Sequence, residues 1–91
     1  MLNNTNKCSH ETLFLGIDGG GTKCKARLED SRGNLLGEGF GGPANIVRSV
    51  EDTITAILSA TNEALWHANL TQNVLENTCA FAGLAGANVQ L

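Results

Sequence analysis

Apolar and polar positions alternate along the first half of the chain. Residues 13–18 form a short apolar run bounded by glycine, which is typical of a buried strand. Residues 24–29 (CKARLE) alternate strictly between apolar and charged side chains, as expected of a strand with one buried and one wet face. The turn residues 30–34 (DSRGN) separate this strand from a third apolar run, 35–40. The pattern predicts an antiparallel meander of three strands.

A helix is expected after residues 41–45 (GGPAN), because their glycines and proline cannot continue a strand. Ser49 suits the N-cap, and the acidic Asp52 follows three residues later, as in a capping box. Helix propensity remains good to about residue 68. Bulky apolar residues at helical spacing are expected to form the core-facing side, and alanines at every fourth position form a ridge that permits close packing. The bulky set is Val50, Ile54, Ile57, Leu58 and Leu65, and the ridge is Ala56, Ala60, Ala64 and Ala68.

Residues 78–82 (TCAFA) predict a last strand, and a second glycine-bearing loop, 83–87 (GLAGA), follows it. The expected order is β-β-β-α-β, an α/β fold. If this strand lies parallel to strand 13–18, the carboxyl ends of the two strands are neighbours. Open α/β sheets bind ligands in the crevice at such an edge. Residues 1–12 are polar and aperiodic and are interpreted as a disordered leader, so the domain spans 13–91.

Composition narrows the class of protein. Hydrophobic residues make up 42% of the 91 residues and charged residues 16%, which is typical of a globular chain. The net charge is −3 and no run of Lys or Arg occurs, which argues against a nucleic-acid surface. No apolar stretch approaches the ~18–20 residues needed to span a membrane. Cys8, Cys24 and Cys79 lack metal-ligand spacing and are interpreted as reduced thiols of a cytoplasmic protein.

Three consecutive glycines follow Asp18, at the end of the first strand. The P-loop and the dinucleotide fingerprint both need a helix after their glycines, whereas the segment that follows here has strand period. A third design is a tight hairpin whose backbone N–H groups bind phosphate, since glycine allows close approach and positive φ. Asp18 would then hold a hydrated Mg²⁺, and Thr22 would add a hydroxyl donor. A hairpin turn without a ligand is the alternative.

These segments together resemble a known family. FLGIDGGGTKCKARL is similar to the first phosphate motif of the actin, hexokinase and heat-shock-chaperone ATPase superfamily. Its combination with GGPANI and AFAGLAGA resembles the N-acetylglucosamine and glucosamine kinases of the BadF/BadG-type ATPase family, over about residues 13–88. The resemblance implies an incomplete ribonuclease-H-like (actin-like ATPase) N-terminal lobe, with the second lobe absent from the chain.

By the same resemblance, the full-length protein would phosphorylate the 6-hydroxyl of N-acetylglucosamine or glucosamine, with ATP and Mg²⁺ as cofactors. Asp18 would lie at the Mg²⁺. Asn45 would approach a sugar hydroxyl, and Gly83 and Gly86 of the second glycine loop would line the substrate site. Lys23 would either add charge near the phosphates or face solvent. The nucleotide-binding residues are expected to be Asp18, Gly19, Gly20, Gly21, Thr22 and Lys23.

No residue of the chain is assigned as catalytic base, so this portion is expected to be inactive alone. Two other functions stay open. Activator ATPases of CoA-ester reductases and dehydratases also belong to the resemblance, although they usually carry a serine in the glycine loop and bind an iron–sulfur cluster. A sugar-sensing module without turnover is the other. Whether the full-length protein forms a homodimer is also open, and His67 and Trp66 are interpreted as surface or packing residues.

Overall fold

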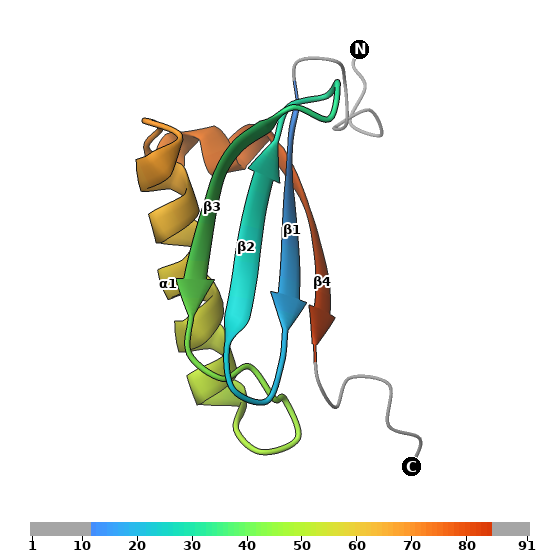
Figure 1. Cartoon of the computed structure of the whole chain (residues 1–91), viewed down its shortest axis with the longest axis vertical. Helices are drawn as coiled ribbons and strands as arrows, with labels where there is room; N and C mark the ends of the chain where they lie inside the picture. Colours follow the sequence, from blue (N-terminus) through green and yellow to red (C-terminus); the bar gives the residue numbers. More distant parts are fainter. Residues whose placement is uncertain (1–11, 85–91) are drawn as a thin grey trace.

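The computed structural model describes residues 12–84, which form a four-stranded sheet with one long helix (Figure 1). The elements follow the predicted order β-β-β-α-β, so the expected α/β fold class is confirmed. A short 3-10 helix, which the polar connection at 69–77 did not reveal, precedes the last strand. The elements are β1 Leu13–Gly19, β2 Cys24–Glu29, β3 Leu35–Gly41, α1 Val50–His67, η1 Gln72–Asn77 and β4 Thr78–Leu84.

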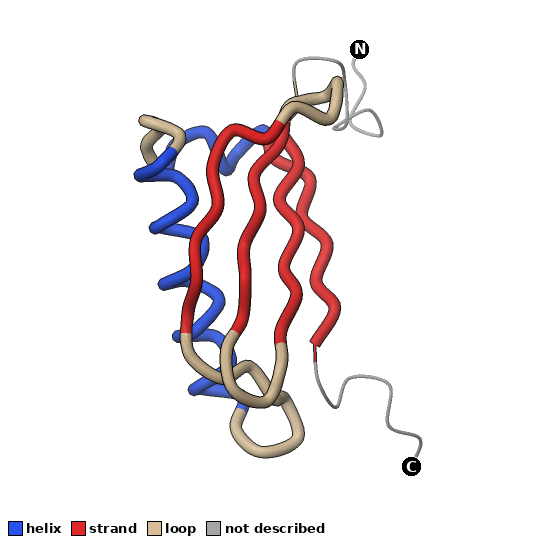
Figure 2. The backbone as a smooth tube through the Cα atoms, viewed as in Figure 1, coloured by secondary structure: helices blue, strands red, loops and turns tan. Residues whose placement is uncertain are grey.

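The sheet has the spatial order β3-β2-β1-β4. β1 pairs antiparallel with β2, which pairs antiparallel with β3, so the predicted meander is present. β1 pairs parallel with β4, so the condition under which their carboxyl ends are neighbours is met. Figure 2 shows α1 along one flank of the sheet, next to β3, and the helix packs mainly on β3 and β2. The opposite face of the sheet carries no helix among the described residues.

Helix α1 begins as the sequence predicts. The Oγ of Ser49 accepts a hydrogen bond from the backbone N–H of Asp52 at 3.1 Å, which caps the first turn. The helix ends at His67, and Ala68 is its C-cap. These local signals need only neighbouring residues, which is why the sequence reveals them.

The expected core-facing side of α1 is only partly correct, because Leu65 is buried and Ile57 packs against the core, but the other three bulky residues do not. Val50, Ile54 and Leu58 are each more than half exposed. The buried positions of the helix are Thr53, Ala56, Ala60, Thr61, Ala64 and Leu65, so three of the four ridge alanines take the core side.

The reason lies in β3, where three consecutive positions of the helix-facing side are glycine: Gly37, Gly39 and Gly41. A Cβ at any of these glycines would collide with a backbone carbonyl of α1, at Ala64, Ala60 or Ala56 respectively. The helix backbone therefore lies directly on the strand, and only alanine fits the contact.

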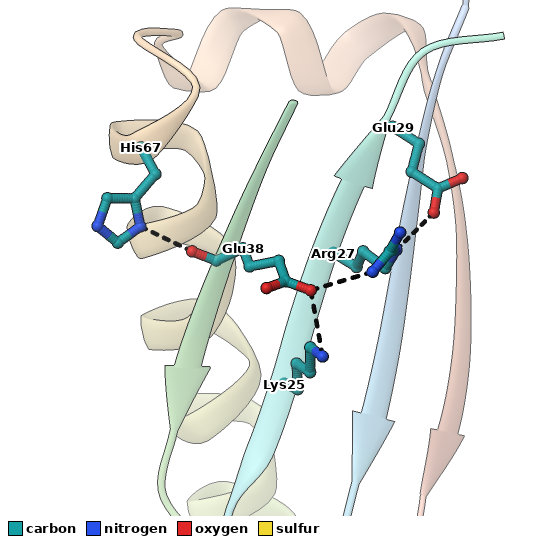
Figure 3. Close-up of polar contacts among 5 residues, drawn as sticks. All are labelled: Lys25, Arg27, Glu29, Glu38 and His67. Carbon is teal, nitrogen blue, oxygen red and sulfur yellow. Dashed lines mark hydrogen bonds and ion pairs between the residues drawn. The ribbon is translucent and has the colours of Figure 1, made fainter. Parts of the chain in front are cut away.

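Two side chains of α1 also hold the outer edge of β3. The Oε1 of Glu63 accepts the backbone N–H of Phe40 at 2.7 Å. The Nδ1 of His67 lies 2.7 Å from the carbonyl oxygen of Glu38, so this nitrogen carries the proton and donates it (Figure 3). His67 therefore links the last turn of α1 to the edge of β3. These bonds occupy edge groups of β3 that another strand could otherwise pair with.

The cysteines correct a second expectation. Cys79, near the start of β4, is disulfide-bonded, so the three thiols are not all reduced. Cys24 is free and buried, and its Sγ donates to the carbonyl oxygen of Ala56 at 3.3 Å. Burial raises the pKa of the Cys24 thiol, which keeps it protonated. Spacing along the chain could not reveal the disulfide, because pairing depends on which cysteines the fold brings together.

The ends of the chain limit two further expectations. Thr12, which the sequence placed in the leader, is 3% exposed. Residues 1–11, with Cys8, lie outside the described residues, and so does Gly86. No helix within residues 12–84 combines the length and apolar character that a membrane crossing requires.

Candidate functional site

Three segments meet at one end of the sheet: the turn between β1 and β2, the loop between β3 and α1, and the carboxyl end of β4 (Figure 1). Gly19 lies at the junction. A Cβ there would come within 2.9 Å of the Ala44 Cβ and 2.9 Å of the Leu84 Cδ2. The N–H of Ala44 also donates to the carbonyl oxygen of Gly20 at 2.9 Å. The glycine turn and the GGPAN loop are thus one connected structure.

The turn itself is closed by a hydrogen bond from the N–H of Gly20 to the carbonyl oxygen of Lys23, at 2.9 Å. Gly21 and Thr22 are exposed, and within residues 12–84 their N–H groups have no hydrogen-bond partner. A Cβ at Gly21 would meet nothing within 4 Å. The tip of the turn therefore presents open backbone donors, the arrangement that binds anions.

The glycine triplet is not there for positive φ. Among the described glycines, Gly33 has a positive φ and the triplet does not. The expectation of left-handed turn geometry at Gly19 to Gly21 is therefore wrong. Gly19 is required instead by the close approach of Ala44 and Leu84, and Gly21 leaves the outer side of the turn open.

Asp18 lies on the face of the sheet away from α1. It is opposite Lys25 in the antiparallel ladder and opposite Gly83 in the parallel one. Its carboxylate is exposed and makes no hydrogen bond or ion pair with any residue between 12 and 84. Asp18, Lys25, Arg27, Phe81 and Gly83 border a hollow of about 560 Å³. The structure thus brings Asp18 and Gly83 together, as predicted.

The donor chemistry of Asp18, a single exposed carboxylate, is compatible with a hydrated divalent cation. Mg²⁺ keeps several waters and takes one or two carboxylates, together with phosphate oxygens. No group of three or more His, Cys, Asp or Glu side chains suited to a metal occurs in the described part of the chain. A cation here would therefore take its ligand from Asp18, with water and phosphate filling the other positions.

Lys23 does not point at the turn. Its Nζ lies 5.4 Å from the centroid of the Phe40 ring, a cation–π contact across to β3. The ammonium group is near the turn but is held by an aromatic side chain, a contact that the sequence did not suggest.

Asn45 has a structural task in the loop. Its Oδ1 accepts the N–H of Val47 at 3.0 Å, and its backbone carbonyl accepts the N–H groups of Arg48 and Ser49 at 3.1 Å. The side-chain amide nitrogen has no hydrogen-bond partner among residues 12–84 and is free to donate. Asn45 borders a second hollow of about 420 Å³, between the loop and the first turns of α1. Asn45 and Asp18 thus border different hollows.

Sequence reasoning missed a group of charged side chains on the open face (Figure 3), of which Lys25 lies opposite Asp18 in the sheet. The Oε2 of Glu38 lies 3.1 Å from the Lys25 Nζ and 3.1 Å from the Arg27 Nη1. The Arg27 Nε is 2.6 Å from the Oε2 of Glu29, and this hydrogen bond raises the pKa of Arg27. The alternation of residues 24–29 predicted a wet face, but the partner Glu38 depends on the β2–β3 register, which the sequence does not show.

Comparison with known proteins identifies the family. A family described as the BadF/BadG/BcrA/BcrD ATPase family matches residues 15–91. The chain belongs to this family. It is 35% identical over 74 residues to glucosamine kinase GspK of Vibrio cholerae serotype O1, a match that covers 81% of this chain and 25% of that protein.

A solved structure from Chromobacterium violaceum, named as a candidate N-acetylglucosamine kinase, superposes with a TM-score of 0.77 at 28% identity. That match covers 88% of this chain and 28% of the solved one. The likeness confirms that the described residues adopt the fold of part of such a protein. The chain spans about a quarter of the length of both relatives.

Proposed function

We propose that this chain is the N-terminal portion of an ATP-dependent amino-sugar kinase, which transfers the γ-phosphate of ATP to N-acetylglucosamine or glucosamine. The observation that carries the proposal is the unpaired carboxylate of Asp18 next to a turn with open N–H groups, a turn that is hydrogen-bonded to the GGPAN loop. A nucleotide-binding turn and a sugar-binding loop would thereby be held at a fixed separation. Phosphoryl transfer depends mainly on such positioning.

In this mechanism the N–H groups of Gly21 and Thr22 donate to phosphate oxygens, and the Thr22 hydroxyl adds another donor. Asp18 would hold a hydrated Mg²⁺, which when bound would supply positive charge beside the phosphates. Gly19 and Gly20 keep the turn close to the loop, and Lys23 adds positive charge nearby. Each of these roles is part of the proposal.

On the sugar side, the free amide nitrogen of Asn45 donates to a sugar hydroxyl. Gly83 lets the sugar or phosphate approach the end of β4, because it has no side chain, and Gly86 is proposed to do the same further along. We assign no general base to any residue of the chain, so the proposal concerns the activity of the whole protein.

The alternative of an activator ATPase has less support. Both relatives are named as kinases of amino sugars. The all-glycine turn also lacks the serine usual for activators. Iron bound to the whole protein would favour that alternative, and sugar-dependent release of ADP would oppose it. Sugar binding without ADP release would instead favour a sensing module.

We also propose a cytoplasmic location and a homodimer for the whole protein. The disulfide at Cys79 argues against the cytoplasmic location, because disulfides are rare in reducing compartments. Thiol alkylation in freshly lysed cells would decide: modified Cys79 supports the cytoplasm, and protected Cys79 opposes it. Sedimentation of the whole protein measures the oligomeric state.

The main test is Asp18→Asn in the whole protein, with Glu76→Gln as the matched control. Both changes remove one negative charge, but the exposed Glu76 lies in η1, at the other end of β4. A bound metal contributes several kcal/mol to phosphoryl transfer, so Asp18→Asn should lower the kcat/KM of sugar-dependent ADP release by about 100-fold. Glu76→Gln should leave the rate unchanged. Equal rates for both variants would contradict the role given to Asp18.

A further inference from the structure

The ion pair that Lys25 makes beside Asp18 is not the one that the β1–β2 register alone would favour. Asp18 and Lys25 are directly opposite each other in the β1–β2 ladder, and side chains in such pairs lie about 4.5–5.5 Å apart at Cβ. Opposite charges in this arrangement usually attract. Yet the Lys25 ammonium lies 3.1 Å from Glu38 on β3, on the other side of β2 (Figure 3). Asp18 is left without a partner among residues 12–84.

Glu38 is well placed to compete for this lysine. It stands opposite Arg27 on the face that also carries Lys25 and Asp18, and its Oε2 contacts both cations. Arg27 is itself fixed by Glu29 at 2.6 Å, so it stays in place and helps to orient the Glu38 carboxylate. The backbone carbonyl of Glu38 accepts the His67 hydrogen bond, which ties this point of β3 to α1.

We propose that Glu38 is a positioning residue that holds the Lys25 ammonium away from Asp18 and so keeps the Asp18 carboxylate open for a hydrated divalent cation. The inference rests on the proposed function of Asp18. Without Glu38, Lys25 turns toward the carboxylate opposite it and forms a cross-strand ion pair. A cation would then have to displace the lysine before it could bind.

An ion pair between Lys25 and Asp18 would affect the binding of magnesium-bound ATP and of metal-free ATP differently. Magnesium-bound ATP needs the Asp18 carboxylate, so an ion pair between Lys25 and Asp18 weakens its binding. Metal-free ATP is repelled by the same carboxylate, so the ion pair leaves its binding unchanged or strengthens it. Exposed ion pairs contribute roughly 0.2–1 kcal/mol, which corresponds to about a 1.4- to fivefold weaker binding of magnesium-bound ATP.

The experiment is calorimetric titration of the whole protein with Mg²⁺–ATP and, separately, with ATP and a chelator. Glu38→Gln is compared with Glu29→Gln, which removes the same charge from the same face but has no contact with Lys25. Strand geometry places both glutamate α-carbons roughly 12–14 Å from that of Asp18, so long-range effects of the lost charge are similar. Only Glu38→Gln should weaken the binding of Mg²⁺–ATP.

The double variant Lys25→Gln with Glu38→Gln provides the decisive control. If the lysine causes the loss, its removal restores wild-type affinity for Mg²⁺–ATP, and a restored affinity also excludes misfolding as the cause. The inference is overturned if Glu38→Gln and Glu29→Gln behave alike, or if removing Lys25 restores nothing. If the unmodified protein does not bind Mg²⁺–ATP, the proposed function itself fails, and the inference fails with it.

Discussion

At the scale of single residues, the site depends on the closeness of backbone to backbone rather than on unusual backbone angles. Gly19 is glycine because Ala44 and Leu84 both close on its α-carbon. Gly21, two residues later, faces open space. Gly19 is therefore required by close packing, whereas Gly21 is not, and alanine substitutions at the two positions can distinguish these cases.

Gly19→Ala should destabilise the protein, whereas Gly21→Ala should not. The new methyl group at position 19 would lie 2.9 Å from the Ala44 Cβ, which cannot turn away, so the loop must shift. Overpacking of this kind costs about 1–3 kcal/mol. At position 21 the cost should stay within about 0.5 kcal/mol, since the φ angle there is ordinary. Urea unfolding of the two variants measures the difference, and equal midpoints would refute this account of Gly19.

At the scale of elements, the sequence predicts what is local. The strict alternation of residues 24–29 placed β2, and Ser49 with Asp52 placed the start of α1. The parallel pairing of β1 with β4 entered the sequence argument only as a condition, and the structure supplies it. The face of α1 was only partly predicted: Leu65 is buried, but hydrophobicity also favours Ile54 and Leu58, where the glycines of β3 admit only the alanine side of the helix.

In the candidate site, too, the local features were predicted from the sequence and the contacts between strands were not. Asp18, the glycine turn and Gly83 could be found from their order along the sequence. That Gly83 lies directly opposite Asp18 follows only from the β1–β4 register. The contact of Phe40 with Lys23 and the contacts of Glu38 with two cations could not be predicted, because each depends on the β2–β3 register. The disulfide at Cys79 likewise depends on a spatial neighbour and not on a spacing.

The corrected face of α1 leads to a test on the chain of 91 residues. Ala60 is 0% exposed and touches β3, so Ala60→Leu should destabilise by about 1–3 kcal/mol or more through overpacking. Leu58 is 56% exposed, so Leu58→Ala should change stability by no more than about 0.5 kcal/mol. Hydrophobic pattern alone would predict the reverse order. Thermal or urea unfolding distinguishes the two, and a larger loss for Leu58→Ala would show that its side chain is covered.

At the scale of the whole molecule, large apolar side chains remain exposed on two surfaces of this part of the protein. Helix α1 shows Val50, Ile54 and Leu58, and the open face of the sheet shows Phe81 at 65% exposure. The chain spans about a quarter of the length of the relatives it matches. Apolar surface of this extent favours association.

The 91-residue chain on its own should therefore self-associate at micromolar to millimolar concentration. Sedimentation velocity measures this directly. Ile54→Ser combined with Leu58→Ser reduces association if the helix surface drives it, because both side chains are exposed and their loss costs little folding energy. Phe81→Ser reduces it if the open face of the sheet drives it. A chain that stays monomeric throughout this range would show that neither surface is adhesive, and the exposed side chains would then be ordinary features of a stable small domain.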